Sequence, residues 1–352
     1  MGVTIRRLDE GSRAVWDRFV QATPSATFFH RAGWAEAVET AFRHTPHYLF
    51  AERDGAITGV LPLIRVKTRL FGDTLISNAF CVYGGVASVD PESAAALVAE
   101  AEALRARLGC SALELRDRDP VPEGSPDPAS ADGWIERPDL YVTFRKPIDP
   151  DNDKNMKAIP RKQRAMVRKA ISLGLTSEVG TDARALYPVY AESVRNLGTP
   201  VFPRRWFEVL MTVFGRDADI VTIMNNGTPV ASVMNFYFRD EVLPYYGGGT
   251  AEARACAAND FMYWEVMRRA ADRGYRLFDF GRSKLGTGAF AFKHNWGFPD
   301  SKLHYRFKMA PGAAIPDHNP TNPKYKLFIE AWRKLPLPVA NTVGPFIVRG
   351  LG

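Results

Sequence analysis

The stretch VLPYYGGGTAEARACAANDFMYWEVMRRAADRGYRLFDFG, residues 242–281, decides the expected fold of the second half of this 352-residue chain. It reads as an apolar strand ending in three glycines, a helix over Asn259–Gly274 with a glycine stop, and an apolar strand over Tyr275–Gly281. In open α/β sheets, ligands bind at the ends of such strands. The end of the second strand is therefore the first place to look for a site.

The same scheme occurs twice along the chain. The segment RDGAITGVLPL around Gly55 matches NNGTPVASVMN around Gly227, and each predicts a turn into an alternating strand. VYGG at Tyr83 matches YYGG at Tyr246, with nine more residues between the markers in the first copy. In the first copy we expect helices over 12–22, 32–42 and 91–109, and strands over 3–8, 48–55, 56–67, 80–88 and 111–118.

Hairpins that feed a mixed sheet covered by helices predict an α+β architecture. Pro, Asp and Asn cluster over Lys146–Asn155, where we place the boundary between the copies. The expected domains are residues 1–148, residues 149–310 with the candidate site, and a tail over residues 311–352. The segment PVPEGSPDPASADG, residues 120–133, is expected to be a loop.

Composition and charge bound the function. Cys81, Cys110 and Cys256 are widely spaced, which predicts neither a metal site nor a disulfide framework and favours a reducing compartment. The chain shows no signal-peptide core and no apolar run long enough to span a membrane, so we expect a cytoplasmic protein. Residues 1–148 carry a net charge of −3 and the remainder +10. The second half is therefore expected to meet an anionic partner, with a solvated basic face as the alternative.

The order of strand, YYGGGT, helix, FDFG and the dipeptide Phe292–Lys293 resembles the FemAB family, tandem-domain acyltransferases of the GNAT superfamily. The chain is most similar to the FemAB-type proteins that accompany exosortase/PEP-CTERM systems, over essentially its whole length. The resemblance implies two tandem GNAT-like domains, each with a mostly antiparallel sheet covered by helices. It also implies transfer of an acyl group, an aminoacyl group from charged tRNA in founding members, to an amine of a cell-envelope precursor.

The chain departs from the family pattern in two places. No long helical hairpin is inserted in the second domain, and GGGTAEARACAAN, residues 247–259, lacks the R/Q-x-x-G-x-G/A phosphate loop of CoA-using relatives. The sequence therefore leaves the donor open between aminoacyl-tRNA and acyl-CoA. Either would be a co-substrate, and no tightly bound cofactor and no metal is expected.

Lys293 is the first candidate catalytic residue. Its neighbours Phe290, Phe292 and Trp296 predict a partly desolvated ammonium, able to bind a phosphate or to stabilise charge on a tetrahedral intermediate. The resemblance implies the same role; the alternative is a lysine whose stem covers an aromatic cluster. Asp279 could orient Lys293 or cap the following loop. That loop, GRSKLGTG, would present flexible backbone donors together with Arg282 and Lys284 to a substrate.

A basic helix, RKQRAMVRKAISLG, forms the second candidate. Pro160 suits its first position, and Arg161, Arg164 and Arg168 fall within an arc of about 60°. No acidic residue occurs from Lys154 to Lys169. Three guanidiniums on one stripe suit a diphosphate, and a solubilising face is the alternative.

The glycine-rich strand end forms the third candidate. Gly247, Gly248 and Gly249 would let a ligand approach the strand's backbone closely. Asn259 or Asp260 would cap the following helix, whose N–H groups favour anions, and Tyr263 would face the same place one turn later. Tyr246 could give a proton to a leaving oxygen or serve as a core tyrosine. The first copy lacks the third glycine and an FK element, so we expect one domain to keep the chemistry and the other to help bind the acceptor.

The tail places Phe328, Trp332 and Leu335 on one helical face with basic residues around it. This pattern suits docking on the domain or contact with a membrane surface. The expected function is acyl transfer to an amine of a peptidoglycan or exopolysaccharide precursor, phosphate-bearing or lipid-linked, with tRNA as a further partner. Such an enzyme could work at the inner face of the cytoplasmic membrane. The alternatives are a CoA-dependent N-acetyltransferase acting on an amino sugar, and a catalytically inactive binding module in envelope assembly.

Overall fold

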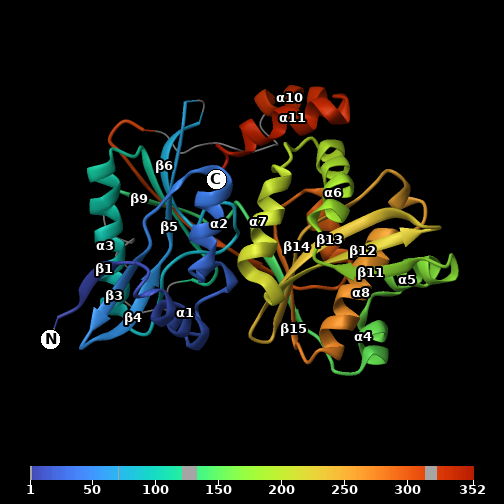
Figure 1. Cartoon of the computed structure of the whole chain (residues 1–352), viewed down its shortest axis with the longest axis horizontal. Coiled ribbons are helices and arrows are strands. Elements are labelled where there is room, and N and C mark those ends of the chain that lie inside the picture. The colour runs from blue at the N-terminus through green and yellow to red at the C-terminus, as the bar shows by residue number, and fades with distance from the viewer. Residues whose placement is uncertain (1, 70, 121–132, 314–322) are drawn as a thin grey trace. The chain divides into compact units, whose positions relative to one another are not determined.

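The structure is a computed structural model that describes residues 2–69, 71–120, 133–313 and 323–352 (Figure 1). It divides into two compact units. The first comprises Met1–Tyr141, Lys302–Asp317 and Arg349–Gly352, and the second comprises Val142–Ser301 and His318–Val348. The loop expected over residues 120–133 lies almost entirely outside the described residues.

The first unit contains two sheets, with strand orders β1-β3-β4-β7 and β2-β5-β6-β8-β17-β9. Its strands are β1 (Thr4–Arg7), β2 (Thr45–Pro46), β3 (Leu49–Arg53), β4 (Ala56–Leu61), β5 (Leu63–Thr68), β6 (Gly72–Ser77), β7 (Ala87–Ser88), β8 (Ala112–Asp117), β9 (Trp134–Arg137) and β17 (His304–Met309). Its helices are α1 (Arg13–Ala22), η1 (Phe28–His30), α2 (Gly33–Phe42) and α3 (Pro91–Leu108). The three long helices lie where the sequence predicts them.

The second unit contains one mixed sheet, with strand order β11-β12-β13-β14-β15-β10-β16. Its strands are β10 (Val142–Pro147), β11 (Thr176–Gly180), β12 (Ala218–Asn225), β13 (Thr228–Phe238), β14 (Glu241–Gly249), β15 (Leu277–Ser283) and β16 (Asp300–Lys302). Its helices are α4 (Asn152–Ala158), α5 (Arg161–Ser172), α6 (Ala183–Leu197), α7 (Arg204–Phe214), η3 (Gly215–Asp217), η4 (Glu252–Arg254), α8 (Ala258–Asp272), α9 (Gly288–Asn295), α10 (Pro323–Arg333) and α11 (Leu337–Val348). The α+β architecture is confirmed.

The two matching turns are hairpins in the structure. Asp54 and Gly55 have φ angles of 51° and 79°, and Asn226 and Gly227 have φ angles of 49° and 78°. Two successive left-handed residues define the type I′ turn, whose twist suits antiparallel strands. The hairpins β3–β4 and β12–β13 therefore follow from local sequence, as predicted.

Two strands, β10 and β17, pair with a sheet in the other half of the chain. β17 pairs with β8 of the first unit, from His304 opposite Asp117 to Met309 opposite Ala112. β10, which directly follows the first unit, pairs with β15 of the second. The units are therefore not the contiguous ranges 1–148, 149–310 and 311–352, because backbone pairing takes one strand from each half into the other half's sheet.

The strand predicted over residues 80–88 is wrong in position. The central strand of the first unit is β6, which runs parallel to β8, and only Ala87–Ser88 of the predicted segment is a strand. Gly84 and Gly85 instead donate their backbone N–H groups to Arg116 O, at 3.1 and 3.0 Å. The VYGG segment therefore closes over the end of β8 as a loop, whereas its counterpart YYGG lies within β14.

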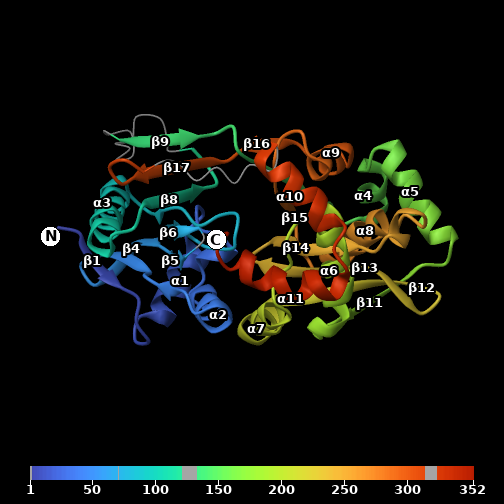
Figure 2. The same ribbon diagram turned by 90° about the horizontal axis from the view of Figure 1, so that it is seen from above.

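Helices cover both faces of the second unit's sheet. Adjacent glycines of β14 show this: a Cβ on Gly248 would meet Ser193 of α6, and a Cβ on Gly249 would meet Asn259 of α8. Since successive residues of a strand point to opposite faces, α6 and α8 lie on opposite faces. Figure 2 shows α7 and α8 on opposite sides of these strands. The core on the α8 face includes Phe144, Phe278 and Phe280.

Candidate functional site

The two central parallel strands of the second unit part from each other. Their ladder consists of Glu241 opposite Leu277 and Val242 opposite Phe278, although β14 continues to Gly249 and β15 to Ser283. β14 also carries a register shift against β13, between Met234 and Asn235. The carboxyl ends of both strands are therefore free of pairing with each other, at the edge where the sequence predicts a ligand.

Lys293 lies on α9 at the end of β15. Its Nζ donates to the carbonyl oxygens of Gly281, at 3.1 Å, and Arg282, at 2.9 Å. The rings of Phe144 and Phe280 lie with their centroids 5.9 and 5.8 Å from Nζ. Burial lowers the pKa of Lys293 from 10.5 to about 7, and the Arg282 guanidinium adds to this while the Asp279 carboxylate opposes it. A protonated lysine has three N–H donors, so one is left after the two carbonyl contacts.

Asp279 lies on β15, two residues before Gly281, and is buried, with 1% of its surface exposed. Its Oδ1 accepts a hydrogen bond from the backbone N–H of Gly281, at 2.7 Å, and its Oδ2 lies 3.2 Å from Nε of Arg145. Arg145 also pairs with Glu241. Of the two roles expected for Asp279, capping the following turn is the one seen. The carboxylate acts on Lys293 through space, by raising its pKa.

Gly281 makes this arrangement possible. Its φ angle of 67° lies in the left-handed region, and the pairing of β15 with β10 shifts register at the same point, between Thr143 and Arg145. The resulting bulge turns the carbonyls of residues 281 and 282 toward α9. Arg282 and Lys284 follow the bulge, and Thr287 donates to Lys284 O at 2.7 Å before capping α9.

The three glycines of β14 have a packing reason. A Cβ on Gly247 would lie 2.7 Å from Val233, and one on Gly249 would lie 2.5 Å from Ala253 Cβ and 2.6 Å from Asn259 Oδ1. Protein side chains thus fill the space above and below the strand. Asn259 Oδ1 is buried and has no hydrogen-bond partner among the described residues. A buried acceptor of this kind is available to a ligand donor.

Tyr246 lies on the other face of the sheet from Lys293. Its ring contacts those of Tyr190 on α6 and Phe207 on α7, with centroids 6.1 and 5.3 Å apart. Lys293 instead lies over Phe280, on the face that α8 covers. Of the two roles expected for Tyr246, the structure supports the core tyrosine.

The start of α8 differs from the expectation. The helix begins at Ala258 after Ala257, whose φ is 57°, and no side chain caps it. The prediction that Asn259 or Asp260 caps α8 is wrong, because both lie inside its first turn. Asp260 Oδ1 accepts a hydrogen bond from Trp296 Nε1 at 3.0 Å, and burial raises the Asp260 pKa. Tyr263 packs on Phe280, with centroids 4.6 Å apart, beside the rings that contact Lys293.

The three arginines of α5, called the arginine stripe below, lie on its outer side. Arg161 and Arg168 are exposed, and Arg164 donates to Lys157 O at 3.1 Å. Pro160 is the residue before the helix rather than its first residue, and its ring lies 3.0 Å from a Cβ built on Gly297. The start of α5 therefore lies beside the chain that leaves α9. No contact between the stripe and Lys293 is seen among the described residues.

Sequence reasoning missed the contribution of β10. Phe144 lies under the Lys293 ammonium, Arg145 pairs with Asp279, and Lys146 lies 5.7 Å from the centroid of Phe298. Burial lowers the pKa of Lys146. The alternating pattern VTFRKP indicates a strand, but only its last two residues fall in the boundary predicted over Lys146–Asn155, and residues 1–148 were expected to form one domain.

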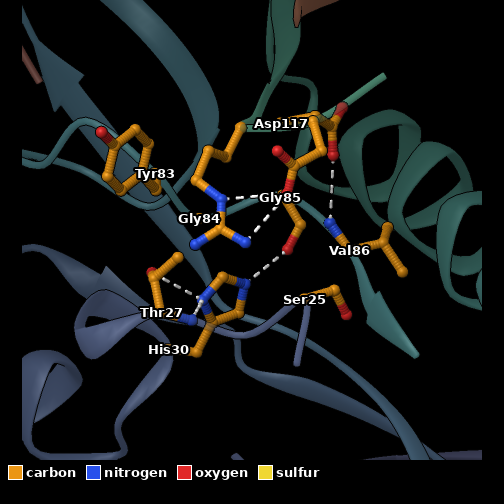
Figure 3. Close-up of a pocket in the computed structure, with 10 residues that line it drawn as sticks. Ser25, Thr27, His30, Tyr83, Gly84, Gly85, Val86 and Asp117 are labelled. Atoms are coloured by element: carbon orange, nitrogen blue, oxygen red, sulfur yellow. Dashed lines mark hydrogen bonds and ion pairs between the residues drawn. The ribbon is translucent and has the colours of Figure 1, made fainter. Parts of the chain in front are cut away.

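The first unit has a polar pocket of about 50 Å³ at the end of β8 (Figure 3). His30 Nδ1 accepts from the Thr27 backbone N–H at 3.0 Å, so its Nε2 donates to Gly85 O at 2.9 Å. Asp117 accepts from Arg306 Nε at 2.9 Å. The full lining is Ser25, Thr27, His30, Tyr83, Gly84, Gly85, Val86, Asp117, Arg118 and Asp119.

Neither a metal-binding cluster of His, Cys, Asp or Glu nor a helix able to cross a membrane is found in the part of the chain that the structure describes.

Comparison with known proteins identifies the fold. Residues 154–294 match the model of the acetyltransferase (GNAT) domain family. The crystal structure of FemX superposes with a TM-score of 0.69 at 16% identity, covering 93% of this chain and 100% of that one. A tandem GNAT protein from the clavulanic acid biosynthesis pathway superposes with a TM-score of 0.55 at 15% sequence identity, covering 90% of this chain and 100% of that one. The structure of L-PGS from Bacillus licheniformis superposes with a TM-score of 0.56 at 12% sequence identity, covering 99% of this chain and 98% of that one. A search of curated proteins finds no match.

Residues 154–294 of the second unit are thus similar to the GNAT domain family, and the whole chain has a tandem GNAT-like fold. The resemblance to the FemAB family is confirmed at the level of the fold.

Proposed function

We propose that this chain is an N-acyltransferase of FemAB type, which moves an acyl group from an activated ester to an amine of a phosphate-bearing cell-envelope precursor. The observation that carries the proposal is the half-buried ammonium of Lys293, held by two main-chain carbonyls where β14 and β15 part. A cation with one N–H left over, in a low-dielectric surrounding, suits the oxygen that becomes negative during acyl transfer.

In the proposed reaction, the acceptor nitrogen attacks the carbonyl carbon of the ester and a C–N bond forms. The carbonyl electrons move to oxygen, and the oxyanion accepts a hydrogen bond from Lys293 Nζ. Collapse of this intermediate breaks the C–O bond of the ester. The proton lost by the attacking amine balances the one gained by the leaving alkoxide, so no net proton is consumed. Asp279 and Arg145 position the bulge that holds the lysine.

Substrate binding is assigned to groups around this point. Asn259 Oδ1, at the end of β14, would accept a hydrogen bond from the acyl donor. Arg282 and Lys284 would contact phosphate near the reacting ester, and the arginine stripe would hold acceptor phosphates. Tyr263 supports the aromatic wall around Lys293.

The loop between β14 and α8 favours an aminoacyl ester over acyl-CoA as the donor. Backbone N–H groups of this loop already donate to protein oxygens; they belong to Thr250, Ala251, Ala253, Ala255 and Cys256. One of the acceptors is the Glu192 carboxylate, 2.8 Å from the nitrogen of Ala251. A diphosphate would have to displace these bonds and approach a negative charge. We therefore propose aminoacyl-tRNA as the donor.

The polar pocket of the first unit is proposed to bind a polar group of the acceptor. It combines the imidazole of His30 and the charges of Arg118 and Asp119 at one opening. This assignment gives the first unit a binding role and leaves the chemistry to the second.

The test is to incubate the purified protein with an amine-bearing nucleotide-sugar precursor and either tRNA charged with labelled amino acids or acetyl-CoA. Mass spectrometry should find an aminoacylated product with the tRNA donors, and none with the Lys293→Met variant. An acetylated product alone would establish the CoA-dependent alternative. Precursor binding without product from either donor would indicate an inactive binding module.

A further inference from the structure

The C-terminal helices leave an unusual surface. α11 contains no charged residue, yet its buried residues are Ala340, Gly344 and Val348. On the opposite side Val339, Val343 and Phe346 are exposed, and Phe346 keeps 79% of its surface accessible. Residues spaced by four and three lie on one face of a helix, so these side chains form a single apolar stripe. When a helix buries one face and exposes a second apolar stripe, that stripe is expected to bind another surface.

The inner face of this helix pair is already occupied. Trp332 of α10 is buried, and Ile329 lies against Gly198 at the end of α6. Arg333 Nη2 donates to Leu197 O at 3.3 Å, and Arg195 Nη1 donates to Arg333 O at 3.2 Å. The tail therefore docks on the second unit, one of the two roles expected for it. The outer stripe of α11 is exposed, and α10 separately exposes Leu327, with 75% of its surface accessible, and Phe328.

We call Leu327, Phe328, Val339, Val343 and Phe346 the apolar patch. Exposed cations accompany it: Lys326 lies on α10, and Lys334 directly follows that helix. Arg349 directly follows α11, and Glu330 is the one acidic residue from Lys326 to Gly352. Figure 2 shows α10 and α11 diverging from the turn that joins them.

We propose that the apolar patch docks on the surface of an anionic lipid bilayer. Exposed apolar side chains bordered by lysine and arginine match the interface of such a bilayer, where side chains enter the acyl boundary and cations meet acidic headgroups. A second copy of this chain fits less well. A two-fold contact would gather the cations of both copies at one interface, with Glu330 as the one acidic residue that each copy contributes from Lys326 to Gly352. The proposal concerns where the protein works and does not depend on its reaction.

Vesicle co-sedimentation tests the docking. The full chain is mixed with vesicles of phosphatidylcholine alone or of phosphatidylcholine with phosphatidylglycerol. We expect the wild-type protein to pellet with the anionic vesicles. Leu327→Gln with Phe346→Gln should weaken binding about tenfold or more, through lost apolar burial. Lys326→Gln with Lys334→Gln should weaken it by about 30-fold, through lost attraction to the headgroups.

Val89→Gln is the matched control, because Val89 is an exposed valine of the first unit and should leave binding unchanged. The proposal is overturned if the wild-type protein stays in the supernatant with both vesicle types, or if the patch variants bind as well as the wild type. A lipid-free dimer that the Leu327/Phe346 variant abolishes, together with no vesicle binding, would assign the patch to a second copy. Circular dichroism and acyl transfer to a water-soluble acceptor should be unchanged in the variants.

Discussion

Replacing Lys293 with Met separates the structural and chemical roles of this residue. The pKa of Lys293 is about 7 in the folded protein against 10.5 for an ordinary lysine. Between these values the unfolded chain binds one more proton than the folded protein, so this residue makes stability rise with pH, by at most about 1.4 kcal/mol per pH unit. Below about pH 7 the folded protein must bury a charged ammonium, which lowers the free energy of unfolding. This loss of stability disappears as the pH approaches 10.5.

The magnitude follows from that slope. From pH 7.5 to pH 9.5 the full contribution would be about 2.7 kcal/mol, and the partial exposure of the side chain reduces it to about 1–2 kcal/mol. Methionine carries no proton and lacks this contribution. From pH 7.5 to pH 9.5, the free energy of unfolding of the wild type should therefore rise by about 1–2 kcal/mol more than that of the variant. Near pH 7 the two proteins should be similar in stability, because relief from burying the ammonium offsets two lost hydrogen bonds.

Activity should respond differently. Loss of one donor to an oxyanion lowers the rate by about 10²–10³-fold, so the variant should be nearly inactive at any pH. In the wild type, kcat should fall as the pH rises through about 7, because the cationic lysine is lost. Urea denaturation at several pH values and product formation from a charged tRNA measure the two effects. The exposed Lys302, changed to Met, is the control. Parallel stability curves for wild type and Lys293→Met, or unchanged transfer by the variant, would refute the reasoning.

Three further changes test the surroundings of the site. Asp279→Asn removes the carboxylate that raises the Lys293 pKa, so the loss of kcat should move to lower pH; an unmoved profile would contradict the through-space effect. Gly249→Ala should destabilise the protein by about 1–3 kcal/mol in thermal denaturation, because the new Cβ would lie 2.5 Å from Ala253 Cβ. Gly180→Ala is the control: open space surrounds this position, so its effect on stability should be close to zero. Alanine replacement of the arginine stripe should raise KM for a phosphate-bearing acceptor and reduce its dependence on salt, and an altered kcat at unchanged KM would count against a binding role.

Much of the fold could be predicted because its signals are local. The turns at Gly55 and Gly227 and the glycine stops at Gly109 and Gly198 each require a left-handed residue, and a few neighbouring residues suffice to recognise them. The position of α9 was missed, because GAFAFKHN begins with a glycine and four adjacent apolar residues and resembles a loop or strand.

The exchange of β10 and β17 could not be predicted from local pattern. Both segments read as strands or linkers of the half they follow, and their partners lie far away along the chain. The Lys293 site shares this limit. The aromatic neighbours of the lysine predict a desolvated amine, but its carbonyl partners depend on a bulge at Gly281, which forms only when β10 pairs with β15.

The exchanged strands also determine the order in which this protein can be completed during synthesis. The sheet of the first unit that contains β8 lacks β17 until the ribosome has translated His304–Met309, long after β8 has emerged. Until then the edge of β8 presents unpaired backbone groups, which attract other chains. A nascent or truncated chain that ends before residue 304 should therefore depend on chaperones, and its two halves should not be separable by cutting at the midpoint.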